Sequence, residues 1–174
     1  MMDAITLLTQ KGVKKIEVRE QLVSAIADGS FSLEDFKSRA GELNDKQTAT
    51  FLEAVEAVTG KKLRLLSADY LHFAEQYILS DNNSCKREAS RIVGNMAADY
   101  PEELETAVSA LLKNTADSGT VVRWGSAYAL ERIIMLEHYR NSGMVQTVRD
   151  IYEAEEESGV KNQYKKALRK IKAI

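Results

Sequence analysis

The sequence has one cysteine, one proline and two histidines among 174 residues, and each scarcity argues against a class of structure. Because Cys85 is alone, the chain cannot form an internal disulfide, which fits either a reducing compartment or a fold that needs no disulfide. Proline breaks helix interiors, so a single proline, Pro101, favours a mostly helical chain. The histidines, His72 and His138, fall in separate predicted helices without a carboxylate motif, which argues against a metal site.

Long apolar runs are also missing. No stretch approaches the roughly 20 residues that cross a bilayer, and the first nine residues lack the long apolar centre of a targeting segment. With 44% apolar and 29% charged residues, the composition is that of an ordinary soluble domain. The net charge of -2 argues against nucleic-acid binding through bulk charge but leaves room for a local basic patch. We therefore expect a cytoplasmic protein without membrane contact.

Signatures of catalysis and of cofactor binding are absent as well. The glycines form no phosphate-binding loop, and the paired acids Glu102 and Glu103 stand in a first helical turn, where acids are expected in any case. Cys85 occupies an apolar position and is expected to be a buried, unreactive thiol. We therefore expect neither a cofactor nor an enzymatic activity.

What the sequence does contain is a helical pattern that occurs three times. The copies begin at Cys85, Val122 and Val160, so the steps between them are 37 and 38 residues. A fixed period of this size indicates stacked pairs of helices. Each copy follows a polar loop and an earlier amphipathic segment, so first helices are expected around residues 70–78, 104–112 and 144–152. Residues 67–174 thus predict about three helix pairs, with Pro101 early in the middle first helix.

The first third of the chain predicts helices outside this phase. One is expected to run from Val13 to about Ile26 and to end at Gly29, and a short one to follow the N-cap Ser32. Another should begin at Asn44 or Asp45 and end at Gly60. Residues 1–66 either hold one degenerate repeat that extends the row or fold back over it. The length of 174 residues suits a single all-α domain.

The middle copy resembles the second helix of a HEAT repeat. The resemblance rests on Val122-Arg123, Ser126-Ala127, Ala129-Leu130 and Ile133, and on an acidic residue six positions before a basic one in each copy: Asp81 and Arg87, Asp117 and Arg123, Glu155 and Lys161. It implies a short right-handed α-solenoid whose second helices line the concave side. It also implies a ladder of bonds between neighbouring units, in which Arg87 (or Lys86), Arg123 and Lys161 donate to those acids. The third copy departs at Tyr164, Lys165 and Lys166, as the polar face of a C-terminal cap would.

Members of this family are mostly protein-binding scaffolds, and a minority bind nucleic acid, including a class of alkylpurine DNA glycosylases. The fold alone does not choose between these functions. An open solenoid end also invites self-association.

A column of basic and aromatic residues is the candidate binding surface. In phase, Arg87 matches Trp124, Arg91 matches Tyr128, and Asn95 matches Arg132, while Lys166 and Lys170 extend the pattern. Such a surface with little acid suits an acidic protein segment, and its rings could also stack on bases. Alternatively, the rings are partly buried between helices and the charges are solvated.

Two further observations bear on the choice of partner. A DNA glycosylase would need a carboxylate beside the aromatic residues to stabilise a developing positive charge. Glu88 and Glu131 are the only acids close by in sequence, and neither stands in the column. The last helix has six basic residues and no acid between Lys161 and Lys172, which suits either an anionic partner or the dipole at a helix end. We therefore expect a non-enzymatic protein-binding module, with nucleic-acid binding as the alternative.

Overall fold

The computed structural model describes residues 3–174. Met1 and Met2, which begin the nine-residue stretch without a targeting pattern, lie outside the described residues. The described residues form eleven α-helices and two 3-10 turns, without a β-strand, so the predicted all-α class is confirmed. The helices are α1 (Ala4–Thr9), α2 (Lys15–Asp28), α3 (Leu33–Arg39), α4 (Asp45–Gly60), α5 (Ala68–Glu75), α6 (Asn83–Met96), α7 (Glu105–Asn114), α8 (Thr120–Ile133), α9 (Glu137–Arg140), α10 (Met144–Ala154) and α11 (Ser158–Lys170). Among these residues, no helix combines the length and the apolar character needed to cross a bilayer.

Local signals set several helix ends where the sequence predicts them. Gly29 ends α2 in the left-handed conformation with a φ of 82°, which glycine adopts without steric cost. The Ser32 hydroxyl accepts a hydrogen bond from the backbone N–H of Asp35 at the start of α3. Asn44 caps α4 through a reciprocal pair of hydrogen bonds with Gln47.

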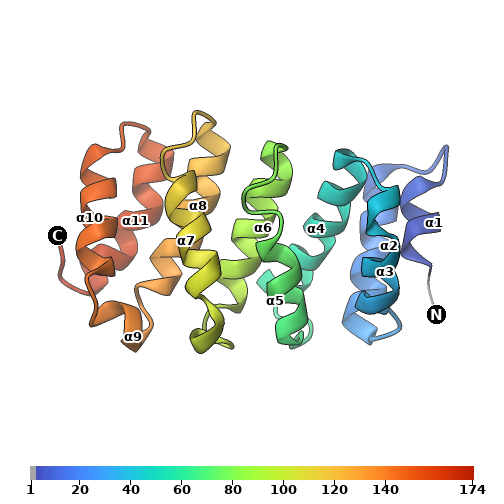
Figure 1. Ribbon diagram of the computed structural model, residues 1–174, viewed down its shortest axis with the longest axis horizontal. Coiled ribbons are helices and arrows are strands. Elements are labelled where there is room, and N and C mark those ends of the chain that lie inside the picture. The colour runs from blue at the N-terminus through green and yellow to red at the C-terminus, as the bar shows by residue number, and fades with distance from the viewer. Residues whose placement is uncertain (1–2) are drawn as a thin grey trace.

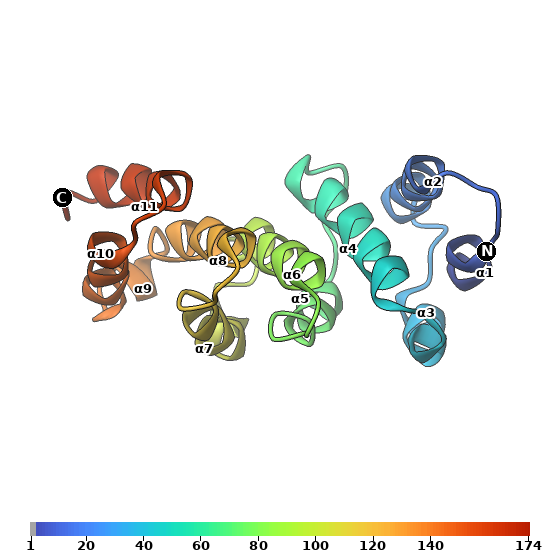
Figure 2. The same ribbon diagram turned by 90° about the horizontal axis from the view of Figure 1, so that it is seen from above.

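Two layers of helices make up the molecule (Figures 1 and 2). In one layer α2, α4, α6, α8 and α11 follow one another, each packed on the next. In the other lie α3, α5, α7 and α10. The first layer is curved, with α6 and α8 set back between α4 and α11 (Figure 2). We call its outer side the concave face.

One continuous cluster of buried apolar residues runs between the layers from Ala4 to Leu168. Residues before Ser67 belong to this cluster as fully as those of the repeats, because Leu22 of α2 and Phe51 of α4 are completely buried. Helices α2 and α4 therefore extend the row and do not fold back over it.

Glycine brings α6 and α8 unusually close. A Cβ atom added to Gly94 would lie 2.9 Å from the Cα of Ala129, and one added to Gly125 would lie 3.1 Å from the Cα of Arg87. Real Cβ atoms essentially never show a contact of 2.9 Å, and a contact of 3.1 Å is tighter than nine in ten of theirs, so glycine lets the two helices pack this closely.

Three details differ from the sequence-based expectation. Pro101 lies in a separate 3-10 turn, Pro101–Glu103, and α7 begins only at Glu105, because Pro101 has no N–H to donate and its ring restricts the preceding residue. The short helix α9 between α8 and α10 was not expected. Tyr164 is fully buried and does not belong to a polar cap, whereas Lys166 is exposed.

Candidate binding face

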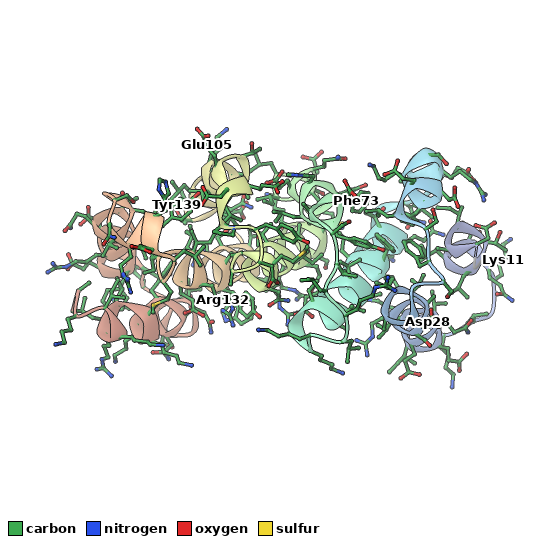
Figure 3. The ribbon with its side chains drawn as sticks, turned by 90° about the horizontal axis from the view of Figure 1, so that it is seen from below. Lys11, Asp28, Phe73, Glu105, Arg132 and Tyr139 are labelled. Atoms are coloured by element: carbon green, nitrogen blue, oxygen red, sulfur yellow. The ribbon has the colours of Figure 1, made fainter. Side chains whose placement is uncertain are left out.

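The predicted aromatic and basic residues of α8 meet those of α6 on the concave face. The ring centroids of Trp124 and Tyr128 are 5.6 Å apart. The guanidinium carbon of Arg91 lies 5.9 Å from the Trp124 centroid and 5.6 Å from that of Tyr128, and that of Arg132 lies 3.4 Å from the Tyr128 centroid. These distances suit cation–π contacts. All four side chains are partly exposed. Figure 3 shows Arg132 on the side of the row away from Glu105 of α7.

This cluster contains far more acid than the sequence suggests, and the expectation of a surface with little acid is wrong. The Glu88 carboxylate accepts hydrogen bonds from Arg87 at 2.7 Å and from Arg91 at 3.0 Å, and only 2% of its side chain is exposed. Glu56 of α4 forms an ion pair with Arg91 at 2.8 Å. A carboxylate that loses its water needs such partners, because an unpaired buried charge is costly.

Glu131 forms the third acidic contact. It pairs with Arg132, which also donates a hydrogen bond to the backbone carbonyl of Tyr128. Burial raises the pKa of the Glu131 carboxyl, and the positive charges of Arg132 and Lys166 oppose that rise. Arg87, Arg91 and Arg132 are thus paired with three glutamates, Glu56, Glu88 and Glu131.

A chain of hydrogen bonds joins three successive helices of the layer. The Tyr128 hydroxyl on α8 donates to the side-chain oxygen of Asn95 on α6 at 2.6 Å. The Asn95 amide in turn donates to the Thr59 hydroxyl at 3.1 Å and to the Glu56 carboxylate at 3.3 Å, both on α4. Burial raises the pKa of Tyr128, so its proton is held firmly for this bond. The network fixes the cluster to its scaffold.

The remaining basic residues of the predicted column make no cation–π contact with the Trp124 and Tyr128 rings among the described residues. Lys166 and Lys170 are exposed on α11, and neither forms an ion pair within residues 3–174. Arg87 turns to Glu88. The structure thus brings four members of the predicted column together, namely Arg91, Trp124, Tyr128 and Arg132.

A ladder of ion pairs also links neighbouring units at the other end of these helices. Lys86 of α6 contacts the Asp117 carboxylate at 2.7 Å, and Arg123 of α8 contacts Glu155 at 2.9 and 3.3 Å. The hydrogen bond from Lys86 lowers the pKa of Asp117. Both acids belong to the loop that precedes the next second helix.

The ladder differs from the expectation at three positions. Arg87 faces Glu88 and takes no part, because consecutive helical residues point about 100° apart and only Lys86 faces the α7–α8 loop. Asp81 is exposed and accepts no ion pair among the described residues. Lys161 donates to the backbone carbonyl oxygen of Glu155 at 3.1 Å, not to a carboxylate.

A pocket of about 390 Å³, which we call the Gly94 pocket, opens beside the cluster. It lies between the C-terminal parts of α4, α6 and α8 and includes Tyr128 and Arg132 in its lining. Lys62, in the α4–α5 connection, and Ala98, after α6, are exposed residues of its lining. The sequence contained one hint of it, a glycine inside the predicted second helix, where glycine costs about 1 kcal/mol relative to alanine.

Within the described residues, no group of three His, Cys, Asp or Glu side chains could hold a metal ion. The only thiol, Cys85, is buried, and burial raises its pKa to about 11, so it is a poor nucleophile near neutral pH. The face presents aromatic rings, guanidinium groups and an open pocket. Comparisons with protein-family models, curated proteins and solved structures found no match.

Proposed function

We propose that the chain is a short, right-handed HEAT-like α-solenoid that acts as a non-enzymatic binding module for a protein segment of acidic character. The single observation that carries the proposal is the cluster of Arg91, Trp124, Tyr128 and Arg132, which is partly exposed and is held by one buried and two largely buried carboxylates. The repeat steps of 37 and 38 residues and the row of packed helices support the solenoid assignment.

The cluster has the properties of a preformed contact site. Tryptophan, tyrosine and arginine are the residue types that dominate binding energies at protein interfaces. Here Glu56 and Glu88 fix the Arg91 guanidinium, and the bond to Asn95 fixes the Tyr128 ring. A partner would lose little side-chain freedom on the module when it binds, and that lowers the entropic cost of association.

The acidic character of the partner follows from the cations that remain unmatched. The arginines of the face are neutralised by Glu56, Glu88 and Glu131. Lys62, Lys166 and Lys170 are exposed and form no ion pairs among the described residues. An incoming carboxylate would therefore meet lysine ammonium groups, while the arginines contribute their planar faces and their alkyl stems.

The nucleic-acid alternative has less support from the geometry. Excision of a base would need a carboxylate that is free to face the substrate. Glu88 is almost wholly enclosed, and the side chains of Glu56 and Glu131 are 13% and 15% exposed and engaged with arginine. These acids serve the scaffold, and that favours binding over catalysis.

Selection from a displayed library of random peptides tests the proposal. We expect the immobilised protein to enrich acidic peptides with apolar residues, and fluorescence anisotropy to show at least about tenfold weaker binding to a Trp124→Ala variant. Leu79→Ala, which removes an exposed apolar side chain at the α5–α6 connection, serves as the matched control. Peptides that bind both variants equally would place the site elsewhere, and a selection that enriches no peptide would contradict the proposal.

A further inference from the structure

We propose that the Gly94 pocket anchors one apolar side chain of the partner, and that carboxylates beside this anchor contact Lys62 and Lys166. This inference rests on the proposed binding function and adds to it a place and a partner chemistry. Three features of the pocket carry it: its fixed wall, its apolar lining and its unpaired cations.

Two glycines of the pocket lining pack tightly against the residues that form its wall. A Cβ atom on Gly60 would lie 3.0 Å from a Glu56 carboxylate oxygen and 3.1 Å from the Asn95 amide nitrogen. One on Gly94 would lie 3.2 Å from the Tyr128 ring and 3.3 Å from the Arg132 side chain. A side chain at either glycine would push these wall residues out of place, so glycine lets the wall pack as it does.

The wall of the pocket cannot easily collapse into that space. Tyr128 is tied through its hydroxyl to Asn95, and its ring is covered by the Arg132 guanidinium. Arg132 is itself held by Glu131 and by the Tyr128 carbonyl. The cavity is therefore preformed, which is the usual condition of a binding pocket.

The lining suits an apolar group. Met135, Leu136, Ala97 and the Tyr128 ring contribute carbon surface on the α6 and α8 sides. The volume of about 390 Å³ lies at the small end of the 300–1,000 Å³ typical of binding pockets, which suits a side chain better than a large ligand. The one acid in the lining, Glu131, is already paired with Arg132.

The charges beside the pocket select what flanks that side chain. Lys62 is exposed, lacks an ion pair among the described residues and stands in a left-handed backbone conformation with a φ of 50° directly after α4. Lys166 is exposed on α11, and α11 packs against α8, the helix that carries Glu131 and Arg132 of the lining. Acidic residues on either side of the anchor would meet both ammonium groups.

Exposed residues allow a test that leaves the core intact. The probes are peptides enriched by the selection described above, labelled with a fluorophore and titrated by anisotropy. Ala98→Leu should fill the pocket and weaken binding at least about tenfold, while Ala116→Leu, the same change in an exposed turn after α7, should alter it by less than about twofold. Lys62→Glu should weaken binding about fivefold at low salt and much less at high salt, with Lys113→Glu on α7 as its control.

The outcomes separate this inference from the function it rests on. Enrichment of no peptide would overturn both. Peptides that lose affinity for Trp124→Ala but bind Ala98→Leu normally would overturn the pocket and leave the binding function standing. Enriched peptides without an apolar residue, or with basic flanks, would overturn the inference as well. The inference would also be refuted by a labelled DNA strand that binds only when Lys62 is intact and that no peptide displaces. The partner at this site would then be a nucleic acid and not a peptide.

Discussion

The close contact between α6 and α8 predicts that one methyl group at Gly94 will destabilise the protein. A Cβ atom there would lie 2.9 Å from the Cα of Ala129, and ordinary contact begins at 3.4 Å. The Ala129 Cα is a backbone atom and the new Cβ is bonded directly to the backbone of α6, so the helices must separate by at least about 0.5 Å to accommodate the methyl group. The concave face would be disturbed too, because the same methyl group approaches Tyr128 and Arg132.

Two opposing energies set the size of the effect. Overpacking of this kind costs about 1–3 kcal/mol, and contact with backbone places Gly94→Ala at the upper end. Alanine in place of glycine inside a helix returns about 1 kcal/mol. We therefore expect Gly94→Ala to lower the free energy of unfolding by about 2 kcal/mol, which corresponds to a decrease in Tm of about 4–8 °C.

Gly159→Ala is the matched control, because Gly159 also lies within a helix but a Cβ atom there would meet nothing within 4 Å. That variant should be as stable as the wild type or more so, by up to about 1 kcal/mol. Urea unfolding followed by circular dichroism measures both differences. If the two variants changed stability equally, the proposed packing of α6 on α8 would be wrong.

Three smaller predictions concern titratable and buried polar groups. The Tyr164 hydroxyl is buried without a hydrogen-bond partner among the described residues, so Tyr164→Phe should raise the free energy of unfolding by up to about 1 kcal/mol in the same urea assay; a loss of more than about 1 kcal/mol would reveal a missed partner. Because burial raises the pKa of the Cys85 thiol to about 11, an aromatic disulfide reagent at pH 8 should label Cys85 only after unfolding, and rapid labelling of the native protein would refute this. Hydrogen bonds to Glu75 and Glu103 raise the pKa of His72, so His72 should contribute a few tenths of a kcal/mol that is fully present below about pH 6.5 and is lost as the pH rises through the folded-state pKa; His72→Gln should remove this pH dependence from thermal melts.

The sequence predicts the helices of this protein well because their signals are local. The helix ends at Gly29, Ser32 and Asn44 depend only on neighbouring residues, and the structure has them where they are expected. The helix α9 and the separate turn at Pro101 were not predicted, because short irregular connections are set by how the flanking helices pack.

The candidate site was predicted only in part, for a related reason. Phase along a helix indicates that Trp124, Tyr128 and Arg132 share a face, and the structure has them together. It does not indicate what a neighbouring helix brings to that face. Glu56 comes from α4, where the repeat pattern is poor, and Glu88, which does not stand in the predicted column, pairs with Arg87 and Arg91. Choices between adjacent residues, such as Lys86 over Arg87 as the ladder donor, depend on helix rotation, which a pattern of residue types does not encode.

Because the helices follow one another in a single curved row, bending at one helix contact changes the shape of the whole molecule. Helix α1 lies at one end of the long axis and α10 and α11 at the other (Figure 1), and each helix of the curved layer packs on the next. A small change in the angle between α6 and α8 at the centre would therefore move the helices on both sides of that contact. The distance between the two ends of the row would change by more than the distance between α6 and α8. Energy transfer between dyes attached near Lys11 and Lys172 would therefore report how strongly the row bends.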